Sequence, residues 1–120
     1  MMEYLAQAIG LPALQAVIDD FIAALRQHPL FAAAMRGVAR LDRLRNRLVT
    51  FWYAVLDGES YRWPAQAGLP LQPASQQEWR AAQQLFDQAI ARHVPQHLAL
   101  GWQQRLAWLG QTLPLAETVG

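Results

Sequence analysis

Two histidines four residues apart, His93 and His97, have the spacing in this chain that most resembles a metal site. On a continuous helix this spacing places two imidazoles on one face, where they could hold zinc. Pro95 lies between them and indicates a helix junction, and no acidic residue is close to them in the sequence. We therefore expect no metal site. The chain has no cysteine, phosphate-binding glycine loop, paired-carboxylate motif or nucleophile with its base, so we do not expect an enzyme acting through its own side chains.

Arginines provide the second candidate site, because four of them recur at spacings of four, three and four residues. This spacing predicts a basic stripe along one side of a helix. The four are Arg36, Arg40, Arg43 and Arg47. A solvated helix face is the simplest interpretation, and the functional ones are an acidic protein partner or the carboxylates of a ligand. Nucleic acid is the weakest alternative, because the net charge of the chain is only +1.

The composition predicts that one small domain positions these residues. The chain has 120 residues, of which 53% are hydrophobic and 16% charged, which suits a single core and excludes a disordered chain. No apolar run reaches the roughly 18–20 residues of a membrane span, and the N-terminus lacks the basic region of a secretory signal. We expect one domain over residues 1–120, loosely ordered at 1–10 and 113–120, in a cytoplasmic protein without membrane contact.

Apolar residues recur every three to four positions and nowhere alternate over the length of a strand, which predicts an all-α fold. The ends of the helices follow from local signals. His28-Pro29 and Gly58 end helices, whereas Ser75 and Glu78 form a capping box that begins one. The expected helices cover residues 11–27, 30–35 (a short connector), 38–56, 75–92 and 94–112.

The segment between the third and fourth of these helices, residues 58–73, contains two glycines and three prolines that interrupt any long helix. A loop of about 15 residues is unusual in a compact domain and is often functional. We therefore expect a site near this loop.

Four main helices with a connector and a long loop fit either an antiparallel bundle or a reduced globin. Particular residues favour the globin. Residues 51–58, Phe-Trp-Tyr-Ala-Val-Leu-Asp-Gly, followed by Tyr61 and Pro64, resemble the end of the E helix in group III truncated haemoglobins. Three further segments resemble the family's B helix with its corner, the start of its G helix and the start of its H helix. They are Phe21 with His28-Pro29-Leu30-Phe31, Pro70-Leu71-Gln72-Pro73 with Trp79, and Pro95-Gln96-His97.

The resemblance covers about residues 14–110 and implies a haem whose iron is held by a histidine shortly after the proline of that loop. Gln66 is nearest to that position, and no histidine occurs between His28 and His93. The family's distal tyrosine and histidine positions fall on Ile22 and near Leu44. We therefore expect a globin-like chain that has lost its oxygen site and has no cofactor.

The former haem space is then expected to be apolar, with Trp63 folding inward to occupy it. Its expected lining is Phe21, Ile22, Leu44, Leu48, Phe51, Trp52, Trp63, Trp79 and Phe86. On this hypothesis the protein is a haem-free binding or interaction module for an unidentified protein partner or a small apolar ligand. The arginine stripe would be its contact surface.

Two alternatives remain open. The first is a haem protein that binds oxygen or another diatomic gas through an unusual axial ligand, with Tyr61, Gln66, Met35 and His93 as the candidate cofactor-binding residues. The second is a helical assembly module whose globin resemblance is coincidental. Homodimerisation through the tryptophan-rich last helices is a further option.

Overall fold

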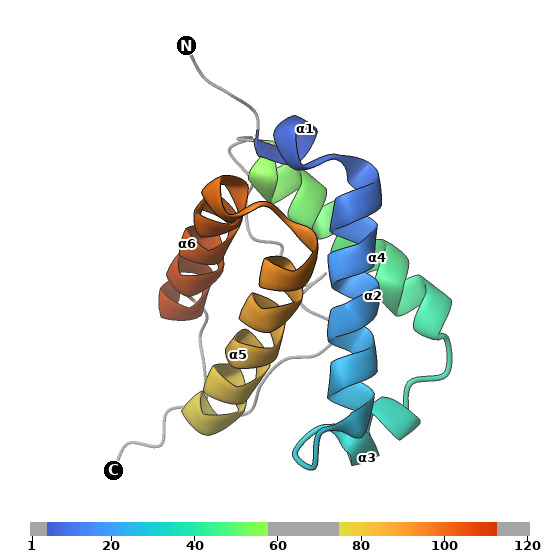
Figure 1. The fold of residues 1–120 in the computed structure, drawn as a ribbon. Coiled ribbons are helices and arrows are strands. Elements are labelled where there is room, and N and C mark those ends of the chain that lie inside the picture. The colour runs from blue at the N-terminus through green and yellow to red at the C-terminus, as the bar shows by residue number, and fades with distance from the viewer. Residues whose placement is uncertain (1–4, 58–74, 113–120) are drawn as a thin grey trace.

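A computed structural model describes residues 5–57 and 75–112, and all regular secondary structure within these ranges is helical (Figure 1). The predicted all-α fold is therefore confirmed for this part of the chain. The helices in these ranges are α1 (Leu5–Ile9), α2 (Leu11–Gln27), α3 (Ala32–Arg36), α4 (Leu41–Leu56), α5 (Gln76–His93) and α6 (Gln96–Thr112).

Helix α1 departs from the expectation that residues 1–10 are loosely ordered. Its Ala6 and Ile9 are buried, and the helix packs against α2, α4 and α6. Gly10 turns the chain into α2 with a φ of 90°, in the left-handed region that favours glycine. Gly101 allows the close approach of α6, since a Cβ there would lie 2.8 Å from Leu5 Cδ2. Five residues are too few for periodicity to reveal such a helix, and residues 1–4 and 113–120 lie outside the described residues.

The predicted boundaries hold for α2 and shift at the start of α4. Helix α4 begins at Leu41 rather than at residue 38, because the preceding Arg40 has extended backbone angles (φ −130°, ψ 91°). Asp42 lies in the first turn of α4, where a carboxylate interacts favourably with the helix dipole. The connector helix α3 ends at Gly37, so residues 37–40 form a short link between two helix axes.

The start of α5 follows its capping signal. Ser75 is the N-cap, and its Oγ accepts a hydrogen bond from the backbone N–H of Glu78 at 3.2 Å. This bond satisfies one of the backbone donors that the first turn of a helix leaves unpaired. The side-chain capping contact predicted from the sequence is therefore present.

Replacing this cap is expected to weaken the fold by a small, measurable amount. Ser75→Ala should lower the free energy of unfolding by about 1 kcal/mol, because the N–H of Glu78 loses its acceptor. Urea unfolding followed by circular dichroism measures the change. Ser75→Asp retains an acceptor and should stay close to wild type, so equal losses for both variants would contradict a capping role.

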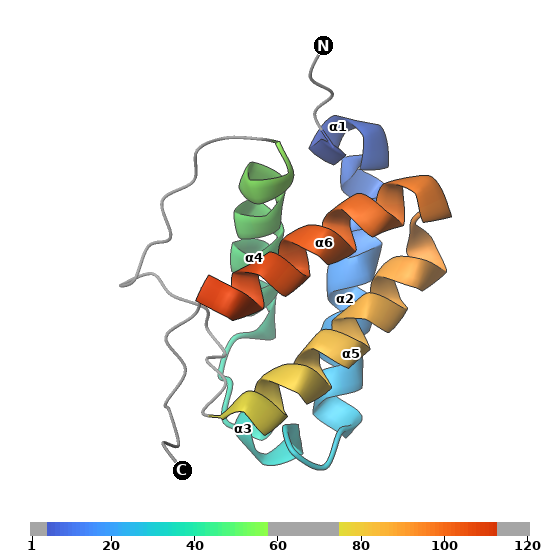
Figure 2. The same ribbon diagram turned by 90° about the vertical axis from the view of Figure 1, so that its left-hand side faces the viewer.

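Helix α2 is the central element of the fold. It packs most extensively against α5 and also against α4, while α5 packs against α6. Figures 1 and 2 show α5 and α6 running antiparallel and α4 passing obliquely across α2. The chain leaves α4 at the end of the molecule where α1 lies and enters α5 at the end where α3 lies. Helices α4 and α5 therefore run in the same general direction, which differs from an up-down-up-down bundle with short loops.

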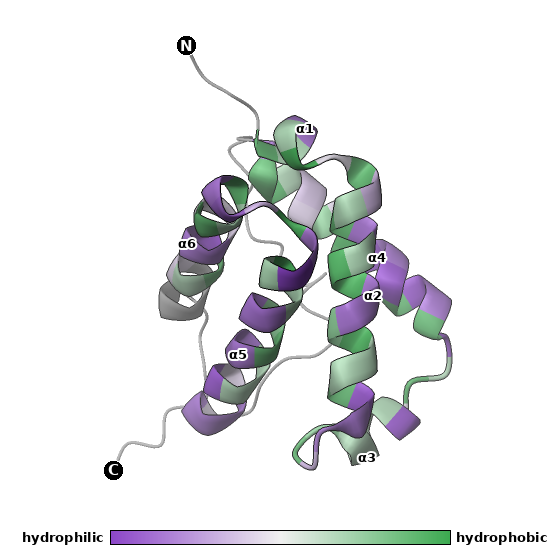
Figure 3. Cartoon of the chain, viewed as in Figure 1, coloured by the Kyte–Doolittle hydropathy of each residue, from purple (hydrophilic) through white to green (hydrophobic). Residues whose placement is uncertain are grey.

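The core lies between these helices. Figure 3 shows the polar residues of α5 on its side away from α2, with apolar residues turned inward. No charged or polar residue within 5–57 and 75–108 is buried. The largest fully buried side chains are Trp52 of α4 and Trp102 of α6, so aromatic rings dominate the interior.

Candidate functional site

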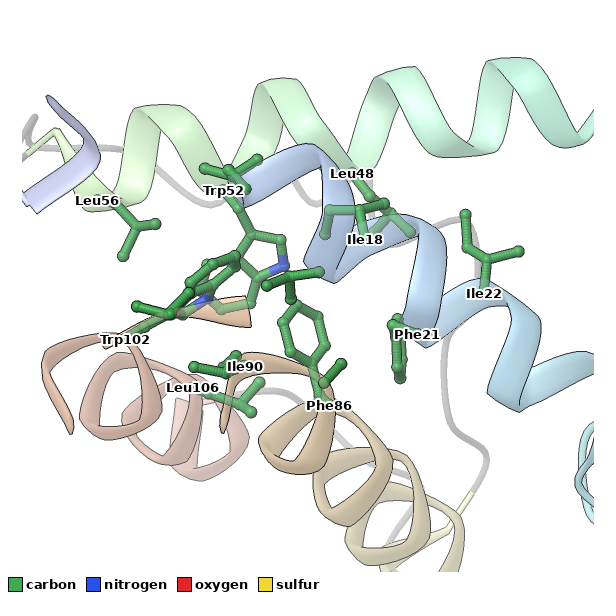
Figure 4. Close-up of a cluster of buried hydrophobic side chains, with 14 of the residues drawn as sticks. Ile18, Phe21, Ile22, Leu48, Trp52, Leu56, Phe86, Ile90, Trp102 and Leu106 are labelled. Carbon is green, nitrogen blue, oxygen red and sulfur yellow. The ribbon is translucent and has the colours of Figure 1, made fainter. Parts of the chain in front are cut away.

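Four aromatic side chains, one from each long helix, meet in the middle of the core (Figure 4). They are Phe21 of α2, Trp52 of α4, Phe86 of α5 and Trp102 of α6, and all four are buried. We call these four residues the aromatic cluster. The ring centroids lie 4.5 Å apart for Phe21–Phe86, 5.4 Å for Trp52–Phe86, 5.6 Å for Phe86–Trp102 and 6.0 Å for Trp52–Trp102. Rings at these separations pack directly against one another, so the cluster occupies the space among the four helices.

The structure brings most of the predicted pocket-lining residues into this one core. Buried are Phe21, Ile22, Leu44, Leu48, Trp52 and Phe86, whereas Phe51 and Trp79 are partly buried and pack against them. Trp63 lies outside the described residues. The residue missing from the predicted lining is Trp102, which follows Leu98 and precedes Leu106 by four residues and so shares their inward face.

The aromatic cluster contributes packing contacts and no reactive group. The indole N–H of Trp102 is buried and has no hydrogen-bond acceptor in the structure described here. An unpaired buried donor costs about 1–3 kcal/mol, which the apolar contacts around it must offset. The cluster thus offers a ligand neither a charged group nor a hydrogen-bond acceptor.

The two candidate haem ligands that the structure describes, Met35 and His93, lie apart from each other and outside the aromatic cluster. Met35 is buried where α3 meets α2 and α4, and it lines a surface groove. His93 is at the surface end of α5, where its Nε2 lies 3.1 Å from Asp20 Oδ2. Tyr61 and Gln66 lie outside the described residues. Within residues 5–57 and 75–112, moreover, no group of three or more histidine and acidic side chains could hold a metal ion.

Asp20 of α2 is instead the centre of a contact that joins α2 to α5. Its Oδ2 accepts a hydrogen bond from Arg92 Nη1 at 2.8 Å and pairs with His93 Nε2. Partial burial by itself raises the pKa of Asp20, but the hydrogen bonds and charges of Arg92 and His93 outweigh it and hold that pKa below 3.8. Spacing could not reveal this contact, because its partners are more than 70 residues apart in the sequence.

Removing this carboxylate is expected to destabilise the protein only where the carboxylate is ionised. Asp20→Asn should lower the free energy of unfolding by about 1 kcal/mol near pH 6, since the ion pairs are partly exposed to solvent. The folded-state pKa lies below the unfolded value, so this stability is present above pH 3.8 and is lost as the pH falls through the folded-state pKa. Urea unfolding at about pH 6 and at a series of lower pH values tests this, because the loss should shrink as the pH falls through the folded-state pKa. A loss that is the same at every pH would show that the charge is irrelevant.

Asp87 of α5 has the opposite electrostatic character. Its Oδ1 is buried without a hydrogen-bond partner among the described residues, and this burial raises the pKa of Asp87 above 3.8. Ionised Asp87 is therefore disfavoured in the fold, and its penalty applies above its folded-state pKa and disappears as the pH falls below 3.8.

Asp87→Asn is accordingly expected to stabilise the protein at neutral pH. The neutral amide should raise the free energy of unfolding by about 0.5–1 kcal/mol near pH 7, because no charge has to be desolvated. The gain should shrink at about pH 2.5, where wild-type Asp87 is itself protonated. Asp20→Asn is the natural control, since the same chemical change there has the opposite sign, and a loss of stability in both variants would contradict the argument.

The predicted arginine stripe does not form one helix face. Arg36 belongs to α3 and Arg40 precedes α4, so only Arg43 and Arg47 lie within α4. The link at residues 37–40 separates the two groups, and a sequence spacing of four has no fixed direction across such a link. The prediction of a continuous stripe is therefore wrong.

Neighbouring carboxylates also neutralise part of this charge. Arg40 pairs with Asp42 at 2.8 Å, and Arg45 reaches across to Asp19 of α2 at 2.6 Å. Arg36 forms no ion pair with any residue of the described ranges. The charge that remains available is thus displaced towards α3.

A groove of about 610 Å³ lies beside Arg36, where the C-terminal part of α2 meets α3 and the start of α4. Arg26 of α2 and Arg36 of α3 supply its charged lining. Met35, Val38 and Leu41 supply apolar lining, of which Met35 is the buried part. The groove therefore combines two guanidinium groups with an apolar surface.

A second exposed feature is apolar and lies on α6. The side chain of Trp108 is 60% exposed, and Leu100 of the same helix is also exposed.

In the part of the chain that the structure describes, no helix is both long and apolar enough to cross a membrane. Comparison of the chain with protein-family models, curated proteins and solved structures finds no match.

Proposed function

We propose that this protein is a haem-free, globin-like scaffold that acts as a binding or interaction module. The observation that carries the proposal is the aromatic cluster. Phe86 touches rings from the three other long helices, with centroid distances of 4.5–5.6 Å, so side chains fill the space among these four helices, and three of the four rings are residues that the resemblance places around a prosthetic group. A filled, apolar interior supports a structural role for the core and places binding at the surface.

The arrangement of the helices supports the globin-like part of the proposal. On the resemblance, α2, α4, α5 and α6 correspond to the B, E, G and H helices. The oblique passage of α4 across α2 and the shared direction of α4 and α5 suit a globin better than an antiparallel bundle (Figures 1 and 2). The contacts of α1 with α4 and α6 add a short A-like helix to this pattern.

The residues present do not fit haem. A globin holds the iron through a protein nitrogen, and the position that the resemblance assigns to this nitrogen is Gln66, an amide. His93 already pairs with Asp20 at the surface. Neither the missing histidine nor the filled interior favours a haem-dependent activity, and we derive none.

A hemin titration tests this proposal. Wild-type protein should give a broad, non-saturating absorption band, like that of loosely associated hemin, and not a sharp Soret band at one haem per chain. A histidine-ligated globin provides the positive control. A saturable Soret band for the wild type would contradict the proposal, and variants of Tyr61, Met35 and His93 would then locate the axial ligand.

Gln66→His is the informative companion, because it supplies the missing nitrogen without changing the aromatic cluster. If side chains fill the interior, this variant should also fail to bind hemin stoichiometrically. A sharp Soret band in Gln66→His alone would show that only the ligand was missing, which would contradict the argument from the filled interior.

A further inference from the structure

The groove between α2, α3 and the start of α4 has a charge pattern that a haem-free scaffold does not explain. Arg26 and Arg36 line it from two different helices, and neither forms an ion pair within residues 5–57 and 75–112. Residues 26–47 contain six arginines and one acidic residue; Asp42 pairs with Arg40, and Asp19 of α2 pairs with Arg45, so positive charge remains in excess. The groove therefore lies in a locally positive potential that attracts anions.

The apolar part of the groove has room for a side chain. Val38 and Leu41 are partly buried, and the buried Met35 provides a flexible apolar surface of the kind found at adaptable binding sites. Ala23 and Ala32 also line the groove, and their methyl groups take up little of its space. A volume of about 610 Å³ is large enough for a bulky aliphatic or aromatic side chain.

We propose that this groove binds an acidic peptide segment of a partner protein. An apolar side chain of the segment packs against Met35 and Val38, and its carboxylates pair with Arg26 and Arg36. Guanidinium groups bind carboxylates through two parallel hydrogen bonds, which gives such pairs direction as well as strength. This inference rests on the proposed function and deepens it by naming the chemistry of the partner.

The pattern fits a peptide better than other anions. A fatty acid offers one carboxylate to two guanidinium groups on separate helices. A nucleic acid offers phosphates but no aliphatic group for the apolar lining, and a net charge of +1 provides little long-range attraction for it. A segment with bulky apolar residues flanked by acidic residues satisfies both features of the groove at once.

Fluorescence anisotropy with a fluorescein-labelled peptide, Gly-Asp-Glu-Leu-Phe-Glu-Asp-Gly, tests the proposal. The wild-type protein should bind it saturably, and replacing Leu-Phe by Ser-Gly in the peptide should weaken binding by at least about tenfold. The double variant Arg26→Glu, Arg36→Glu should also bind at least about tenfold more weakly. Ala23→Trp should do the same by filling the groove while all charges remain.

The matched control is Arg80→Glu, Arg105→Glu, which changes the net charge by the same amount on α5 and α6, helices that do not line the groove. Its affinity should stay within about twofold of wild type. Circular dichroism verifies that each variant is folded. Equal weakening by both double variants would overturn the proposal, because the binding would then follow net charge alone.

Competition experiments distinguish a peptide from a nucleic acid or a fatty acid as the ligand of the groove. Together with the hemin titration, they also distinguish failure of the groove inference from failure of the haem-free scaffold. Tighter binding of a fluorescein-labelled oligothymidine, or displacement of the peptide by dodecanoate at a lower concentration than by unlabelled peptide, would overturn the peptide proposal. Absence of peptide binding together with a negative hemin titration would refute the groove inference and leave the haem-free scaffold standing. Stoichiometric hemin binding together with peptide binding that depends on Arg26 and Arg36 would refute the haem-free scaffold and leave the groove inference standing.

Discussion

Phe86→Ala is expected to lower the free energy of unfolding by about 3–5 kcal/mol, which is among the largest effects of any single substitution in this chain. Phe86 is buried and its ring touches Phe21, Trp52 and Trp102. Truncation removes these ring contacts and leaves a cavity among α2, α4, α5 and α6 that small shifts of the helices cannot easily close. Urea unfolding at neutral pH, followed by far-ultraviolet circular dichroism, measures the loss.

Two further variants make this prediction decisive even if Phe86→Ala does not fold. Phe86→Leu retains most of the apolar volume and should lose only about 1–2 kcal/mol. Leu100→Ala removes an exposed apolar side chain from α6 and should change the stability by less than about 0.5 kcal/mol. Similar losses in Phe86→Leu and Leu100→Ala would mean that Phe86 is not at the centre of the packing.

Trp52→Ala is expected to have an effect of similar size, about 3–5 kcal/mol, for a related reason. Trp52 is buried in α4 and is the ring through which α4 contacts the cluster residues of α5 and α6. Its loss would separate α4 from the other long helices without changing any charge. Thermal and urea unfolding should both show the decrease, with a less cooperative transition if α4 detaches first.

Trp108→Ala is the matched control, because it deletes the same side chain from a position that is 60% exposed. It should change the stability by less than about 0.5 kcal/mol. A double-mutant cycle between Trp52→Ala and Phe86→Ala, or between milder replacements at both positions, should give a coupling of about 0.5–1.5 kcal/mol. Additive losses would show that the two rings contribute independently and would weaken the description of a single cluster.

These predictions bear on function as well as on stability. If the aromatic cluster holds the four long helices together, its side chains serve packing, and the proposed interactions fall to exposed features of the molecule. Of these, the groove with Arg26 and Arg36 combines a concave apolar surface with unneutralised charge, whereas Trp108 and Leu100 of α6 are exposed but do not line this groove.

The sequence predicted the helical elements well where periodicity was long and end signals were strong. Helix α2 extends over the predicted residues, and Ser75 caps α5 as expected. The prediction was weaker where segments were short. Helix α1 has five residues, and the start of α4 depends on the backbone angles of Arg40, which the apolar period does not reveal.

The candidate site, too, was predicted from the sequence only in part. The apolar character of the predicted lining was evident from spacing along each helix, since helical periodicity assigns residues to an inward face. Spacing does not state which rings from different helices touch, so the place of Trp102 beside Trp52 and Phe86 was not predicted. The arginine prediction was wrong because it treated residues on both sides of the link at 37–40 as one helix.

The sequence by itself determined that this chain is helical, that its helices have apolar faces, and that no histidine occurs between His28 and His93. These properties are local, since they depend on residue type, period and short-range capping. The tertiary structure alone decided that four rings meet in the core, that Asp20 pairs with residues more than 70 positions away, and that Arg26 and Arg36 border one groove. Such contacts depend on how the helices cross, and the crossing results from the packing of all the side chains together.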